Sequence, residues 1–130
     1  MRSPAEIIAR YAALRAEVGP DVTVVELSGR MTLGRDSQRV ESMLSNLLTE
    51  GCRKLIIDLS RVNYVDSSGV GLIAYCANKA GQLGAQLRVA GTSGMVLDVF
   101  HMTRVDLVVP FCADVAAAIA SVNGEAGMPA

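Results

Sequence analysis

A short run of apolar residues at positions 55–57 lies between two segments that have the hydrophobic spacing of helices. Before this run, apolar residues recur at positions 40, 43, 44, 47 and 48, which is the spacing of one helical face. We predict a helix over residues 37–50 that Gly51 ends. A continuous apolar run beside such a helix is typical of a central strand that is covered on both faces. The chain is therefore expected to fold as layers of helices on a sheet.

The same alternation of helix and strand continues towards the carboxyl end. A second helix is predicted over residues 67–82, because apolar side chains at positions 72, 73, 76, 77 and 80 share one face. Further strands are predicted at residues 22–27, 87–90 and 107–109, and further helices from near Ser93 and over residues 115–122. Residues 29–36 are predicted to be a loop that could begin with a short strand, and residues 61–65 a short connection. Strands that alternate with helices favour a partly parallel sheet.

The first 21 residues allow two interpretations. Residues 3–6, Ser-Pro-Ala-Glu, resemble a helix-capping box with proline at the first helical position. Residues 12–18 run up to a Gly-Pro-Asp turn signal, and they fit the first strand of a hairpin equally well. We expect a short helix followed by a strand that pairs antiparallel with residues 22–27, which would make the sheet mixed.

Size and composition favour one folded domain whose partners are neither nucleic acids nor membranes. The chain has 130 residues, of which 51% are hydrophobic and 19% charged, and its net charge is −1. No basic patch stands out, so nucleic acids and anionic membranes are poor partners. The apolar runs are too short to insert into a bilayer, and the first residues lack the apolar core of a signal peptide. A cytoplasmic location is therefore expected.

The cysteines and the single histidine do not suggest a metal site. Cys52, Cys76 and Cys112 are odd in number and widely spaced, so they are expected to be small apolar residues without disulfide partners. His101 is expected on the surface or in packing rather than in catalysis. A Cys/His metal site would need more ligands than these, so no metal and no cofactor are expected.

The segment that is most informative about function joins the apolar strand to the 67–82 helix. It places the hydroxyl groups of Ser67 and Ser68 between Asp66 and Gly69, at the first turn of a helix. Helix starts carry unpaired N–H groups and a partial positive charge, so they favour an anion such as phosphate. The same tetrapeptide also fits a plain helix cap followed by small residues for tight packing. The residues alone leave both interpretations open.

In its position and with its flanks, this segment resembles the STAS family, the anti-sigma factor antagonists of bacteria. The resemblance rests on residues 55–60 and 62–71, with further blocks at 24–34 and 81–100, and it covers about residues 12–122. It implies one STAS-like α/β domain over residues 12–124, with a mixed, mostly parallel sheet of four or five strands. About four helices are expected to pack mainly on one face. Residues 1–11 would be an N-terminal extension that could hold the short helix, and residues 125–130 a flexible C-terminal tail.

The resemblance implies a binding protein, not an enzyme, that phosphorylation switches. The cognate anti-sigma factor, which is itself a serine kinase, would phosphorylate Ser67, and a separate phosphatase would reset it. The unphosphorylated form would bind the anti-sigma factor and free a sigma factor for transcription, as in a stress response. Asp66, Ser68 and Gly69 would complete the switch loop. The alternative is a STAS scaffold, or a subunit of a transport complex, that binds its partners without phosphorylation.

Two further loops are candidate partner contacts at the same edge of the sheet as Ser67. Their residues are Leu33, Gly34 and Arg35 in the first loop and Thr92, Ser93 and Met95 in the second. Both loops could instead be ordinary helix starts, with Met95 in the core. Asp58 is expected to accept hydrogen bonds from loop N–H groups and so to support the Ser67 loop, the alternative being assistance to phosphoryl transfer.

Two enzyme-like alternatives fit the sequence less well. A serine hydrolase needs a glycine two residues before its nucleophile and a histidine base, but Val65 takes that place and His101 is the single candidate base. A dinucleotide site would fit the G-x-G-x-x-A pattern of residues 69–74. The next strand, however, ends near residues 90–91 without an acidic residue for a ribose. Close packing of helix on sheet explains the glycines better.

Overall fold

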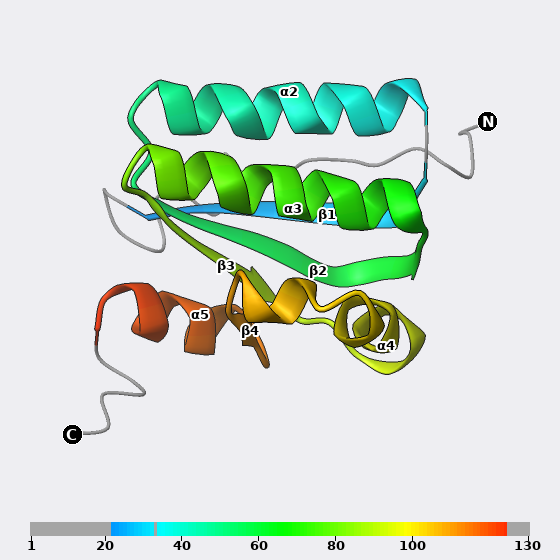
Figure 1. The fold of residues 1–130 in the computed structure, drawn as a ribbon. Helices are drawn as coiled ribbons and strands as arrows, with labels where there is room; N and C mark the ends of the chain where they lie inside the picture. Colours follow the sequence, from blue (N-terminus) through cyan, green and yellow to red (C-terminus); the bar gives the residue numbers. More distant parts are fainter. Residues whose placement is uncertain (1–21, 33, 125–130) are drawn as a thin grey trace.

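The computed structural model describes residues 22–32 and 34–124, apart from the side chains of residues 35 and 36. Strands and helices alternate through this range (Figure 1). They are β1 (Val22–Met31), α2 (Arg35–Thr49), β2 (Lys54–Val65), α3 (Ser67–Gln82), β3 (Gln86–Ala90), α4 (Gly94–Met102), the 3-10 helix η1 (Val105–Leu107), β4 (Phe111–Cys112) and α5 (Val115–Val122). The helices predicted at residues 37–50, 67–82 and 115–122 are thus confirmed as α2, α3 and α5.

The described strands form one sheet in the order β1-β2-β3-β4, and every neighbouring pair is parallel. Parallel neighbours cannot be joined by a tight turn, so the chain crosses over through a helix each time. α2 follows β1, α3 follows β2, and α4 with η1 follows β3. A single α/β domain with a mostly parallel sheet is therefore confirmed. The predicted extension at 1–11, its short helix, the antiparallel strand at 12–18 and the tail at 125–130 all lie outside the described residues.

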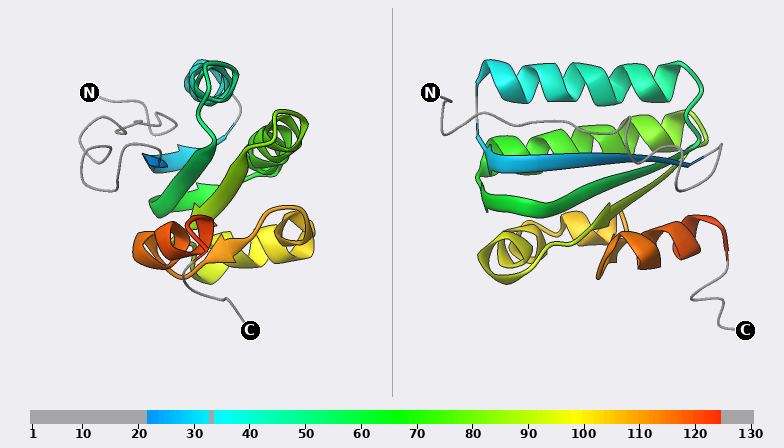
Figure 2. Two further views of the ribbon diagram at one scale, coloured as in Figure 1. Left: turned by 90° about the vertical axis from the view of Figure 1, so that its left-hand side faces the viewer. Right: turned by 180° about the vertical axis from the view of Figure 1, so that it is seen from behind.

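Helices cover both faces of the sheet (Figure 2). Each face has its own hydrophobic core, and successive strand side chains alternate between the two cores. In β2, the buried Leu55 and Ile57 join the larger core with α2, α3 and α4, whereas the buried Ile56 points to the opposite face. α5 covers that face through Ala118 and Val122. The apolar run is therefore a central strand covered on both sides, and the helices lie mainly on one face, as predicted. Within the described ranges, no helix is both long and apolar enough to cross a membrane.

Residues 61–65, predicted to be a short connection, are strand, and the predicted 29–36 loop begins with strand residues 29–31, the short strand that the sequence analysis allowed there. β1 runs on to Met31 and β2 to Val65, and these extended ends pair with each other. The β1–β2 register shifts at two points, one of them next to Gly29, whose φ is 101°. Glycine adopts this backbone conformation without strain, so a bulged strand continues through a residue that usually marks a turn.

The strand predicted at residues 107–109 is wrong. The chain forms η1 up to Leu107, and Leu107 and Val108 are 75% and 66% exposed. The strand comes later, as β4, where the carbonyl groups of Pro110 and Cys112 accept hydrogen bonds from backbone N–H groups at the end of β3. Proline has no N–H to donate, but its carbonyl group still accepts, so Pro110 leads into a strand instead of ending one.

Cys76 gives a test of the packing between α3 and the sheet. Its thiol is fully buried in the larger core, and burial, with a smaller effect of the Glu41 carboxylate, raises its pKa from 9.0 to about 12. The folded chain should keep Cys76 protonated at about pH 8.5, where free thiols react readily. We expect Ellman's reagent to modify Cys76 no faster than the chain unfolds, as followed by peptide mass spectrometry. Modification of native Cys76 at the rate seen in denaturant would contradict this packing.

The raised pKa of Cys76 also sets the direction of a pH effect on stability. The unfolded thiol ionises near its ordinary pKa of 9.0, whereas the folded thiol ionises only near pH 12. Above pH 9 the unfolded state therefore binds fewer protons, and this thiol makes the free energy of unfolding fall as the pH rises towards 12.

Candidate functional site

Three strand-to-helix connections lie together at the carboxyl-terminal end of the parallel strands, on the right-hand side of Figure 1. Because β1, β2 and β3 are parallel, their carboxyl ends lie together and the helices that follow them begin there. The connections are residues 32–34 before α2, Asp66 before α3 and residues 91–93 before α4. The structure thus brings the three predicted site segments to one edge, which we call the switch edge. Leu33 and the side chain of Arg35 lie outside the described part.

Asp66 ties the first turn of α3 to the end of β1. Its carboxylate oxygen Oδ1 accepts hydrogen bonds from the backbone N–H of Ser68 at 2.9 Å and of Gly69 at 3.3 Å, which makes Asp66 the N-cap of the helix. Its own N–H donates to the carbonyl oxygen of Met31, the last residue of β1, at 3.2 Å. Ser67 is the first residue of α3 and is exposed, so its hydroxyl group lies on the surface of a firmly held turn.

The cap changes what the start of α3 can offer to an anion. The sequence analysis expected free N–H groups there, but those of Ser68 and Gly69 already donate to Asp66. A phosphate on Ser67 would still interact favourably with the positive end of the helix dipole, but it would lie close to a carboxylate.

Gly69 allows α3 to approach the ends of both strands closely. A β-carbon at this position would lie 2.4 Å from Cγ2 of Val65 and 2.8 Å from Cβ of Met31. Both neighbours are buried in the larger core, where close packing leaves them little room to move. A β-carbon on Gly71 would meet no atom within 4 Å. Close packing therefore explains the first glycine of the G-x-G pattern and not the second.

Asp58 supports the strand bulge rather than the Ser67 turn directly. It is 7% exposed, and its Oδ1 accepts a hydrogen bond from the N–H of Ser60 at 3.0 Å, where the β1–β2 register is shifted. Gly91, which follows β3 with a φ of 82°, lies against the same carboxylate, since a β-carbon there would be 2.9 Å from Oδ1. Asp58 therefore links the bulge of β2 to the start of the 91–93 connection. The predicted hydrogen bonds to the Ser67 loop are absent among the described residues.

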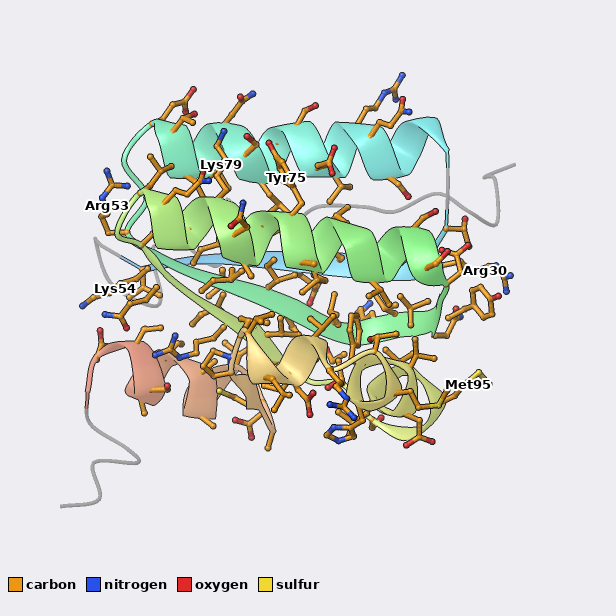
Figure 3. The ribbon with its side chains drawn as sticks, viewed as in Figure 1. Arg30, Arg53, Lys54, Tyr75, Lys79 and Met95 are labelled. Atoms are coloured by element: carbon orange, nitrogen blue, oxygen red, sulfur yellow. The ribbon has the colours of Figure 1, made fainter. Side chains whose placement is uncertain are left out.

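Met95 is an exposed apolar side chain on the switch edge. It lies in the first turn of α4 and is 64% exposed, so the alternative that placed it in the core is wrong (Figure 3). Ser93, the N-cap residue of α4, is also exposed and makes no side-chain capping hydrogen bond. Thr92 and Gly34 are half-buried.

The sequence analysis missed one pair of residues beside the Ser67 turn. Arg30 and Tyr64 lie opposite each other in the β1–β2 register, each one residue before the end of its strand. The guanidinium carbon of Arg30 lies 4.1 Å from the centre of the Tyr64 ring, a cation–π contact. Arg30 projects from the molecule on the same side as Met95 (Figure 3). The strand register could have revealed this pair, but residue 64 was predicted to lie in a connection and residue 30 in a loop that could begin with a short strand.

The single histidine is not placed to activate Ser67. His101 lies in the last turn of α4, whereas it is the first turn of α4 that belongs to the switch edge. Nδ1 of His101 is 2.5 Å from Oδ2 of Asp106, which engages the ring at that far end. In the described ranges, no cluster of His, Cys, Asp and Glu could hold a metal ion. The switch edge has the make-up of a binding surface with an exposed hydroxyl group.

Solved structures with the same fold include proteins of several functions. An anti-sigma factor antagonist from Mycobacterium paratuberculosis matches with a TM-score of 0.80 and 21% identity, over 95% of this chain and 99% of that chain. The Bacillus cell fate determinant SpoIIAA in its phosphorylated form matches with a TM-score of 0.66 and 18% identity, over 89% and 98%. A sulfate transporter family protein from Wolinella succinogenes matches with a TM-score of 0.68 and 16% identity, over 81% and 87%. At these identities the likeness concerns the fold.

The sequence itself identifies the family. Residues 13–118 match the family model of the STAS domain, which is most of the chain. No protein with a curated function matches the sequence. The chain belongs to the STAS domain family, as the resemblance of its 55–71 segment indicated.

Two glycine substitutions should separate close packing from helix propensity at the start of α3. Gly69→Ala forces a β-carbon against Met31 and Val65, and overpacking of this kind costs about 1–3 kcal/mol. Gly71→Ala is the matched control, because its β-carbon meets open space and alanine stabilises a helix by about 1 kcal/mol relative to glycine. We expect urea unfolding to give a lower free energy of unfolding for the first variant and a higher one for the second. Equal effects would show that Gly69 is not held closely against the strands.

Proposed function

We propose that this STAS domain is an anti-sigma factor antagonist and that phosphorylation of Ser67 switches it off. The unphosphorylated form binds an anti-sigma factor, which then releases its sigma factor for transcription. The anti-sigma factor is also the serine kinase, and a separate phosphatase restores the binding form. The chain contributes a surface and catalyses no step of this cycle.

The observation that carries the proposal is an exposed hydroxyl group on a rigid turn. Ser67 is exposed, while the Asp66 cap and the close packing of Gly69 fix the backbone around it. A preformed surface loses little conformational freedom when a partner docks on it. The neighbouring groups at the switch edge include the small residues Ser93 and Gly94, both exposed, so a partner can approach the hydroxyl group closely.

The chemistry of the switch is one phosphoryl transfer. The terminal phosphoryl group of ATP, bound to the partner kinase, moves to Oγ of Ser67 while the hydroxyl proton is lost and ADP leaves. The product adds a charge of about −1.5 to −2 beside the Asp66 carboxylate, which caps the same helix turn. Burying that charge in a close contact without a counter-charge would cost several kcal/mol, so the partner dissociates.

Similar proteins support the proposal and also supply an alternative. One of the matching structures is an anti-sigma factor antagonist, and another is the phosphorylated form of SpoIIAA. A third belongs to the sulfate transporter family, which keeps open a STAS subunit that binds its partners without phosphorylation. The two functions differ in one property that can be measured. In the transport or scaffold alternative, a charge at position 67 has no effect on partner binding.

The charge at position 67 should decide between these two functions. Ser67→Asp should weaken binding to the host's anti-sigma kinase at least tenfold, or about 1.4 kcal/mol, whereas Ser67→Ala should bind nearly normally. Ser42→Asp, on the exposed face of α2, is the matched control for an added charge away from the switch edge. Titration calorimetry measures the affinities, and sigma-factor release in a reconstituted mixture measures the consequence. Unchanged binding by Ser67→Asp would favour the transport or scaffold alternative.

Met95 should contribute to the same docking surface as an apolar contact. Met95→Gln should weaken binding of the anti-sigma kinase by about tenfold, because an apolar side chain that is buried as one of the few central contacts of an interface costs more than about 1 kcal/mol when it is replaced. Met102→Gln makes the same change at the other end of α4, where the side chain is 79% exposed, and should bind normally. Equal affinities of the two variants would exclude Met95 from the contact.

A further inference from the structure

The three most exposed large apolar side chains among the described residues lie within one short stretch of the chain. They are Met102, Leu107 and Val108, which are 79%, 75% and 66% exposed. Single exposed apolar residues are common on soluble proteins, whereas several together usually mark a contact surface. The stretch begins at the end of α4 that lies away from the switch edge, so the proposed switch gives it no role.

The backbone brings these side chains onto one corner of the molecule. Arg104 has a left-handed conformation with a φ of 63°, and its carbonyl oxygen accepts the N–H of Leu107 at 3.1 Å. The chain therefore folds back directly after α4. Nδ1 of His101 lies 2.5 Å from Oδ2 of Asp106, which joins the end of α4 to η1. Met102 and Leu107 each follow one member of this pair, so they lie on segments that are side by side.

The corner is held firmly from below. Val105 and Val109 are buried in the larger core, so the backbone that carries Leu107 and Val108 is anchored on both sides. A surface that is already ordered loses little conformational freedom when a partner docks on it.

Two charges of opposite sign lie at the ends of this apolar patch. Asp98 precedes Met102 by four residues, so both lie on one face of α4, and Arg104 follows Met102 by two. Both charged side chains are exposed, and neither forms an ion pair with another described residue. The nearby Asp106 already contacts His101. A surface with an acid at one end and a base at the other is complementary to its own copy across a two-fold axis.

We propose that a second copy of this chain binds at this corner and forms a two-fold symmetric dimer. Leu107 and Val108 pack at its centre, and Asp98 pairs with Arg104 of the partner subunit on either side. The net charge of −1 leaves little repulsion between two copies. The patch is small compared with a standard interface of about 800 Å² per partner, so the dissociation constant is expected in the micromolar range.

The test is the oligomeric state of the full chain. Sedimentation equilibrium between about 10 µM and about 1 mM should show reversible association, with a reducing agent to keep the free cysteines from cross-linking copies. Leu107→Asp should raise the dissociation constant at least about tenfold, because the two-fold axis places the added carboxylate in the contact twice. Ser42→Asp adds the same charge on the exposed face of α2 and should leave the constant unchanged.

Exchanging the two charges tests the two-fold arrangement itself. Asp98→Arg and Arg104→Asp should each weaken the dimer at least about threefold, because each sets like charges opposite each other twice. Aspartate tolerates the left-handed backbone of residue 104, so the second variant should fold normally. The double variant restores opposite charges and should regain the wild-type dissociation constant to within about twofold.

Three results would overturn the inference. A chain that stays monomeric at about 1 mM would leave the patch to a protein of another kind. A dimer that Leu107→Asp leaves intact would lie on a different surface. A double variant no tighter than the single ones would exclude the pairing of Asp98 with Arg104. None of these measurements involves Ser67 or the anti-sigma kinase, so their outcome is independent of the proposed switch.

Discussion

The contact between the first turn of α3 and the ends of β1 and β2 determines the rest of the functional surface. One hydrogen bond, from the N–H of Asp66 to the carbonyl oxygen of Met31, joins helix start and strand end. The Asp66 carboxylate caps the helix on one side of this bond, and Gly69 packs against Met31 and Val65 on the other. These contacts hold the backbone on both sides of Ser67 in one conformation. A modification there acts on a rigid surface and not on a mobile loop.

Much of this architecture could be predicted from strong local patterns. The apolar spacing at positions 40, 43, 44, 47 and 48 predicts α2, and the wholly apolar residues 55–57 predict a strand covered on both faces. Asp66 before two serines and a glycine predicts a capped helix start, which the structure contains. These features depend on neighbours within a few positions, so the sequence indicates them directly. The parallel order of the strands then places the candidate site at their carboxyl ends.

The features that could not be predicted depend on strand register and on bulges. Gly29 and residues 61–65 resemble turns locally, but pairing between the ends of β1 and β2 makes them strand. The Arg30–Tyr64 contact exists only because that pairing sets the two residues opposite each other. The hydrogen bond of Asp58 could not be predicted for the same reason. Its carboxylate accepts from the N–H of Ser60 at the bulge, and not from the Ser67 loop. In each case the contact joins two segments, and local sequence patterns do not show how those segments align with each other.

Strand β4, one of the two outer strands of the described sheet, is only two residues long, and Pro110 precedes it. A long, flat outer strand offers a row of unpaired backbone groups to which other chains can add, and this is a common route to fibrous aggregates. Two residues beside a proline, which has no N–H to donate, provide almost no such template. At this side of the sheet the fold is therefore protected against polymerisation by strand addition.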